Sequence, residues 1–233
     1  VEVDAGLLAD AGTAVRMALA PTNERKALLD AAIRRIAATS PANTARTGLA
    51  HDQRLLFHAW LAAYYGDPAT AAGLIGKLGD LTRIAEYPAT AKLLGLVEST
   101  IMAHRGDPAG AIRKLQASVD GTEYCITHLV LMDLYAQNKD FSSAREQAAW
   151  LAKHRGRVHV EAAAGEAFVP FNVYQSTLAN AHFADYSLRL DDQAAARKAL
   201  ADLRAAWSQQ DMPAELLRLA SRLEKESRDT TEK

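Results

Sequence analysis

The sequence predicts an all-α protein, and three observations support this prediction. Alanine supplies about a fifth of the 233 residues, and alanine loses less free energy on entering a helix than any other residue. Aromatic residues make up only 6% of the chain and runs of β-branched residues are almost absent, although strands are enriched in both. A turn-like heptapeptide also recurs between segments whose apolar residues have helical spacing. The chain is therefore expected to be built from repeated helical hairpins.

The recurring segment is Gly-Asp-Pro-Ala-Thr-Ala-Ala at residues 66–72. It returns at 106–112, and versions without proline occupy 138–145 and 190–197. Glycine suits the left-handed residue that follows a helix, aspartate suits an N-cap, and proline suits the first helical position. The segment therefore predicts a joint that ends one helix and begins an antiparallel partner. The first three joints lie 40 and 33 residues apart, which is typical of helical repeats.

The joints organise the rest of the chain into one expected domain over residues 1–227. The predicted hairpins cover 52–86, 90–119, 123–154 and 173–207. Two earlier helices, over 4–20 and 22–38, form a degenerate hairpin and are followed by a loop at 39–47. A last helix at 213–227 is expected to cap the array, and residues 228–233 form a frayed tail. The total is about 11 helices.

Residues 155–172 interrupt the pattern. They contain glycines and a proline and show no sustained helical period. The sequence predicts an ordered inserted loop here, with one extended piece at 157–161. The apolar side chains of Phe168, Val169 and Phe171 are expected to pack against the core.

These hairpins resemble tetratricopeptide repeats. The third unit matches that family best, and the residues that carry the match are Leu131, Tyr135, Ala144, Ala148 and Leu151. The other units share an early alanine in the second helix but depart elsewhere, with His58 and Glu98 at the position of Leu131. The resemblance covers about residues 52–207 and implies a right-handed superhelix, a TPR-like α-solenoid. The chain also resembles the C-terminal helical-repeat region of bacterial multidomain regulators.

Composition excludes several classes of protein. The net charge of −1 gives no overall attraction for nucleic acid, so no direct nucleic-acid contact is expected. The basic clusters at 34–35 and 153–157 are interpreted as solvated helix faces. A single cysteine rules out an internal disulfide framework. No apolar run reaches the ~18 residues of a membrane span. Cytoplasmic location is favoured, although a periplasmic one is compatible with excision from a membrane-anchored parent, and the start at Val1 favours a fragment.

No motif in the sequence predicts catalysis, a metal site or a cofactor. Gly73, Gly76 and Gly79 have the spacing of a phosphate loop, but no strand precedes them, so close contact between helices is the expected role. The seven histidines lack the spacing that would place two imidazoles on one helical turn. The aspartates of the joints are explained as N-caps. The chain is therefore expected not to be an enzyme.

The expected function is binding of a protein or peptide in the concave groove of the array, as the sensing or scaffolding part of a larger signalling protein. The alternative is a small-molecule sensor in which residues 155–172 form a lid over the groove. The oligomeric state and the ligand stay open. The resemblance places these residues in the groove: Gln53, Trp60, Tyr64, Thr100, His104, Asp133, Gln137, Asp185 and Arg189.

Overall fold

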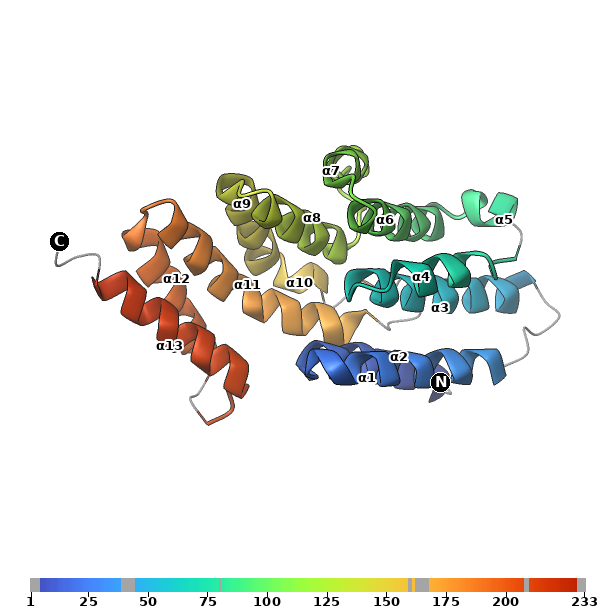
Figure 1. Cartoon of the computed structure of the whole chain (residues 1–233), viewed down its shortest axis with the longest axis horizontal. Coiled ribbons are helices and arrows are strands. Elements are labelled where there is room, and N and C mark those ends of the chain that lie inside the picture. The colour runs from blue at the N-terminus through green and yellow to red at the C-terminus, as the bar shows by residue number, and fades with distance from the viewer. Residues whose placement is uncertain are drawn as a thin grey trace. The chain divides into compact units, whose positions relative to one another are not determined.

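The computed structural model describes residues 5–38, 45–79, 81–158, 161, 168–207 and 210–229. This part of the chain is all-α, as predicted, and contains thirteen helices and no strand (Figure 1). The helices are α1 (Ala5–Leu19), α2 (Thr22–Ala38), α3 (Ala45–Tyr64), α4 (Pro68–Ile75), α5 (Leu81–Glu86), α6 (Pro88–His104), α7 (Pro108–Ala117), α8 (Cys125–Gln137), α9 (Phe141–Lys153), α10 (Arg155–Val158), α11 (Val169–Arg189), α12 (Gln193–Ala206) and α13 (Ala214–Asp229).

The chain divides into two compact units. Unit 1 contains residues 1–127 and 159–172, and unit 2 contains residues 128–158 and 173–233. The division falls inside α8 and inside α11, so neither unit is a continuous stretch of chain. The single repeat domain expected over 1–227 stays a prediction. The expected tail begins inside α13, which continues to Asp229.

Four joints between helices share one backbone geometry. Each places a residue with positive φ after the first helix: Gly66, Gly106, Lys139 and Asp191 have φ of 91°, 97°, 61° and 59°. In each joint the amide of the next residue donates back across the last helical turn, as Asp67 N does to Ala62 O at 2.8 Å. A second bond runs from the amide of the positive-φ residue to the carbonyl three residues earlier. Together the six-to-one and five-to-two bonds form a Schellman motif at each helix end. The segment that recurs in the sequence therefore has the same backbone conformation at all four joints.

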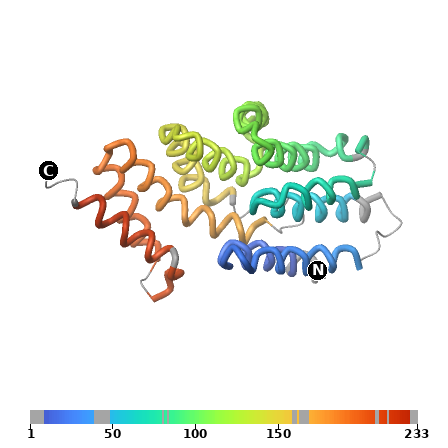
Figure 2. Tube along the Cα trace, viewed as in Figure 1, coloured from blue at the N-terminus to red at the C-terminus, as the bar shows by residue number. Residues whose placement is uncertain are grey.

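An aspartate N-cap restarts the chain at every joint. Asp67, Asp107, Asp140 and Asp192 accept hydrogen bonds from the backbone amides three residues later, at 2.8–3.1 Å. The cap satisfies one of the orphan amides of the first turn. α3 packs against α4, and α6 against α7 (Figures 1 and 2). The N-cap role predicted for Asp67, Asp107 and Asp140 is confirmed, and Asp192 has the same role.

The core of unit 1 contains an aromatic cluster. The rings of Phe57 and Trp60 on α3 lie 4.6 and 5.6 Å from the ring of Phe168, and Phe171 lies 5.2 Å from Trp60. All four side chains are fully buried. The predicted packing of Phe168 and Phe171 is confirmed, because these two side chains fill the space beside α3. Val169 is only half-buried.

Unit 2 is closed at its end by α13. Leu216 and Ala220 of α13 pack against Ala181 of α11 and Leu203 of α12. The guanidinium of Arg204 donates to both oxygens of Glu224, at 2.7 and 3.1 Å, and this bidentate pair joins α12 to α13. The helix expected at the end of the array therefore covers apolar surface of its neighbours.

Two predicted boundaries in this region are wrong. α3 begins at Ala45 and not near residue 51. The helix predicted at 69–86 is two helices, because Gly76 ends α4 and the amide of Gly79 donates to Asp52 Oδ1 at 3.1 Å. Gly73 and Gly76 also have room for a side chain, since a Cβ there would meet no other helix within 4 Å. Gly73 therefore lies inside α4 and Gly76 at its end, and neither mediates close helix packing.

The expected inserted loop is largely helical where it is described. Residues 155–158 form α10, and α11 begins at Val169, before the predicted start at 173. The extended piece predicted at 157–161 is wrong for Arg157 and Val158, and residues 159, 160 and 162–167 lie outside the described part of the chain. Glu161 accepts hydrogen bonds from the Cys125 amide at 2.7 Å and from Asn172 Nδ2 at 2.6 Å. The carboxylate therefore ties the start of α8 to α11 within unit 1.

Candidate functional site

The predicted groove residues have very different environments. Trp60 is fully buried and Thr100 is 4% exposed, so both are core residues and their assignment to a groove surface is wrong. Gln53 in unit 1 is half-buried and donates to Thr90 Oγ1 at 3.0 Å. Tyr64 is also half-buried, and its ring stacks on Trp60 at 5.1 Å.

The other predicted residues lie at or near the surface of their units. His104 of unit 1 is exposed, and so are Gln137 and Arg189 of unit 2. Asp133 and Asp185 are half-buried. Arg189 donates to Asp185 Oδ2 at 3.4 Å, one turn away on α11. That contact joins two of the nine residues, and whether they bind a ligand stays a prediction.

Unit 1 contains a buried polar cluster formed by Asp10, Arg54 and His58. Arg54 donates to both carboxylate oxygens of Asp10, at 2.6 and 3.4 Å. His58 Nδ1 lies 2.9 Å from the Arg54 carbonyl oxygen, which can only accept, so Nδ1 carries the proton. Among the residues that the structure describes, Nε2 of His58 has no hydrogen-bond partner, and it lies 3.6 Å from Asp10 Oδ1. Burial lowers the pKa of His58 below its ordinary value of 6.5, although Asp10 acts in the opposite direction.

This cluster is poorly placed to act on a ligand. Asp10 and His58 have no exposed surface and Arg54 is 9% exposed. The two charges form an ion pair joining α1 to α3 inside the core. A buried pair of this kind holds helices in one arrangement but offers no route to a substrate.

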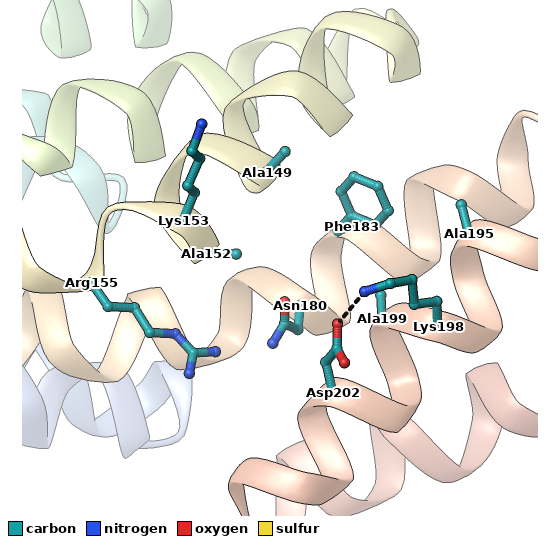
Figure 3. Close-up of a pocket in the computed structure, with 10 residues that line it drawn as sticks. All are labelled: Ala149, Ala152, Lys153, Arg155, Asn180, Phe183, Ala195, Lys198, Ala199 and Asp202. Carbon is teal, nitrogen blue, oxygen red and sulfur yellow. Dashed lines mark hydrogen bonds and ion pairs between the residues drawn. The ribbon is translucent and has the colours of Figure 1, made fainter.

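Unit 2 contains an open pocket of about 520 Å³ between α9, α11 and α12 (Figure 3). We call it the unit 2 pocket. Its lining residues are Ala149, Ala152, Lys153, Arg155, Asn180, Phe183, Ala195, Lys198, Ala199 and Asp202. None of the nine predicted groove residues is among them.

Small side chains create the space. α9 buries Ala144, Ala148 and Leu151 in the unit, and the alanines beside that face, Ala149 and Ala152, line the pocket. α12 contributes Ala195 and Ala199 in the same way. A methyl group at these positions leaves room that a longer side chain would fill. Alanine favours helix formation in α9 and α12, and its short side chain also leaves room for a pocket between them.

Phe183 provides the aromatic wall of the pocket. The ring is half-buried and packs against the cluster formed by Ala184, Ala196 and Leu200. The guanidinium of Arg145 lies 5.9 Å from the ring centroid, and Arg145 donates to Asp192 Oδ2 at 3.0 Å. α9, α11 and α12 thus hold this ring in place.

Three cationic side chains line the same pocket. Lys153 ends α9, Arg155 begins α10, and Lys198 pairs with Asp202 one turn along α12 at 3.1 Å. Figure 3 shows the guanidinium of Arg155 extending toward Asn180, while Lys198 meets Asp202. The Nε of Arg155 is buried and has no hydrogen-bond partner within the described part of the chain.

A stack of rings positions α10. The indole of Trp150 lies between the imidazoles of His128 and His154, at 3.5 and 4.2 Å between ring centroids. The guanidinium of Arg157 lies 5.4 Å from the Trp150 ring centroid. Arg157 thereby ties α10 to α9, and this attachment holds Arg155 at the pocket.

Sequence reasoning missed this pocket although it noted the basic cluster at 153–157. The cluster was interpreted as a solvated helix face, but α9 ends at Lys153 and α10 begins at Arg155. Lys153 and Arg155, on either side of this break, both line the unit 2 pocket. Gly156, two residues after His154, signals the end of α9, but no local pattern indicates the direction in which α10 continues.

Comparison with known proteins gives no family: no family model, no curated protein sequence and no solved structure matches the chain. Within the described residues, no group of three or more His, Cys, Asp or Glu side chains is arranged to hold a metal ion. No helix in that part of the chain is long and apolar enough to span a membrane.

Proposed function

We propose that this chain is a TPR-like helical-repeat module that binds a peptide segment of a partner protein and does not catalyse a reaction. The four joints support the repeat, because each combines a positive-φ residue, a Schellman motif and an aspartate cap. Four hairpins with equivalent joints are the units from which a right-handed α-solenoid is built. In this proposal the module is the sensing or scaffolding part of a larger bacterial regulatory protein.

The unit 2 pocket is the observation that carries the binding proposal. Its volume of about 520 Å³ lies in the range of about 300–1,000 Å³ that is usual for ligand pockets. It is open at the surface, and its lining is mixed, with the apolar alanines and Phe183 together with the polar Arg155 and Asn180. An open pocket of mixed character suits one or two side chains of a protruding peptide.

The small-molecule alternative uses residues 155–172 as a lid over the groove, and the described residues of that segment have other contacts. Phe168 and Phe171, two of the described residues of the 155–172 segment, are core residues of unit 1. Glu161 also has structural partners, the Cys125 amide and Asn172. A small molecule would therefore have to bind in the unit 2 pocket without a lid from these residues.

Selection from a phage-displayed library of random peptides tests the proposal. We expect the immobilised chain to enrich peptides whose binding weakens about tenfold or more in Ala195→Leu, because leucine would fill part of the pocket. Ala194→Leu is the matched control, since Ala194 is exposed on the same turn and does not line the pocket. Circular dichroism verifies that both variants fold. Failure to enrich any peptide, or equal binding by both variants, contradicts the proposal.

A further inference from the structure

We infer that the unit 2 pocket recognises an acidic peptide segment, with an apolar side chain lying against the alanines and Phe183 and carboxylates attracted by the positive charges of Arg155 and Lys153. The inference rests on the proposed peptide-binding function and specifies the chemistry of the peptide. It comes from the charge, burial and shape of the ten lining residues.

The first argument is the local charge. Among the described residues that line the pocket, Lys153, Arg155 and Lys198 are cationic and only Asp202 carries a carboxylate, so two positive charges are in excess. The whole chain has a net charge of −1, which makes this excess a local feature. Lys198 is already paired with Asp202, and this pairing leaves Lys153 and Arg155 as the cations available to a ligand. A basic peptide would meet repulsion here.

The second argument is the state of Arg155. Its Nε is buried and has no hydrogen-bond partner within the described residues, and a buried donor of a charged group is costly to leave unpaired. Its guanidinium points toward Asn180 in Figure 3. A guanidinium fork matches the two oxygens of a carboxylate, and the amide of Asn180 can donate a further hydrogen bond. The polar side of the pocket is therefore suited to a carboxylate.

The third argument is the apolar side. Ala149, Ala152, Ala195 and Ala199 offer only methyl groups, and the half-buried ring of Phe183 lies beside them. An aliphatic side chain such as leucine would bury apolar surface against these groups. The polar and apolar residues line one pocket, so the acidic and apolar residues of the peptide must be close in sequence.

A direct binding measurement tests the inference. The probe is fluorescein-labelled Glu-Glu-Leu-Glu-Glu with its C-terminus amidated, so that a terminal carboxylate plays no part. Its comparison peptides replace every Glu by Gln, every Glu by Lys, or Leu by Ser. Fluorescence anisotropy with the wild-type chain should rank the acidic probe first. The Gln and Ser peptides should each bind about tenfold more weakly, and the Lys peptide weakest.

Matched variants assign the effect to the pocket. Arg155→Gln should weaken binding of the acidic probe about tenfold. Arg218→Gln removes the same charge from an exposed site on α13 and should leave the affinity unchanged. Asp202→Asn removes the one carboxylate of the pocket and should tighten binding about threefold. A purely structural role of these residues does not produce a gain in affinity.

The outcomes separate the inference from the proposed function. If the phage selection enriches peptides that bind in the pocket but lack acidic residues, and Arg155→Gln leaves their affinity unchanged, the inference is wrong and the peptide-binding function stands. If free glutamate binds as tightly as the acidic probe, the ligand is a small anion and the inference is also wrong. If no peptide is enriched, both fail together.

Discussion

At the scale of single residues, the four joints show whether glycine is needed for its backbone conformation or for lack of space. Gly66 and Gly106 have open space around the position of a Cβ, so glycine is required there by its positive φ and not by crowding. Lys139 and Asp191 adopt the same left-handed backbone with a side chain, and this conformation is costly for an L-residue. The third and fourth joints are therefore strained relative to the first two.

Glycine at the strained positions should stabilise the protein. We expect Lys139→Gly and Asp191→Gly each to raise the free energy of unfolding by about 0.5–1 kcal/mol, and Gly66→Ala to lower it by about 1 kcal/mol. Urea denaturation measures the change. Asn138→Gly is the control, because this neighbouring residue does not have positive φ, and it should be destabilising. Destabilisation by Lys139→Gly would contradict the assignment of strain.

His58 should make unit 1 sensitive to acid. Burial lowers its pKa in the folded state below 6.5, so the unfolded chain takes up a proton first as the pH falls. The resulting loss of stability begins near pH 6.5 and continues down to the folded-state pKa, with a slope of at most about 1.4 kcal/mol per pH unit. The charged groups that influence His58 are Asp10, Arg54 and Arg35.

The difference between wild type and His58→Gln isolates this effect. Urea denaturation at pH 7.5 and at pH 5.5 should show a smaller loss of stability in the variant, because groups that titrate elsewhere contribute equally to both proteins. His104→Gln is the control, because this histidine of unit 1 is exposed, and it should lose stability as the wild type does. Equal losses in wild type and His58→Gln would show that the buried imidazole does not govern acid stability.

At the scale of elements, Glu161 is the feature of the interrupted segment that can be tested alone. We expect Glu161→Ala to destabilise the protein by about 2–3 kcal/mol, because the Cys125 amide loses its acceptor and the buried Asn172 amide loses another. Urea denaturation gives the change, and Glu86→Ala, at an exposed site in unit 1, should change stability by less than about 0.5 kcal/mol. A similar small effect of Glu161→Ala would mean that these bonds add nothing.

The elements also show how far the sequence predicts this fold. The aspartate-centred joints were predictable because a left-handed residue followed by a cap is a local signal. The start of α3 at Ala45 was not, since the preceding polar residues favour loops when no tertiary contact is considered. The burial of Trp60 was missed for the same reason: its neighbours Phe168 and Phe171 are distant in sequence. The unit 2 pocket depends on where α9 and α12 place their alanines, which no local pattern encodes.

At the scale of the whole molecule, the net charge of the chain and the local charge of the unit 2 pocket predict opposite effects on the binding of an acidic peptide. A chain of net charge −1 would weakly repel an acidic peptide, whereas the unit 2 pocket has two positive charges in excess. Salt screens either effect, since the Debye length falls from about 10 Å at 0.1 M to about 3 Å at 1 M. Local attraction therefore predicts weaker binding as salt is added.

The amidated acidic probe should lose about tenfold in affinity between about 0.05 M and about 0.5 M NaCl, measured by fluorescence anisotropy. Arg155→Gln should flatten this dependence, because it removes a charge that faces the bound carboxylates. Arg218→Gln changes the net charge by the same amount from outside the pocket, so it should preserve the wild-type slope. Equal slopes in the two variants would assign the salt effect to the charge of the whole chain, and the unit 2 pocket would then not be the site of acidic recognition.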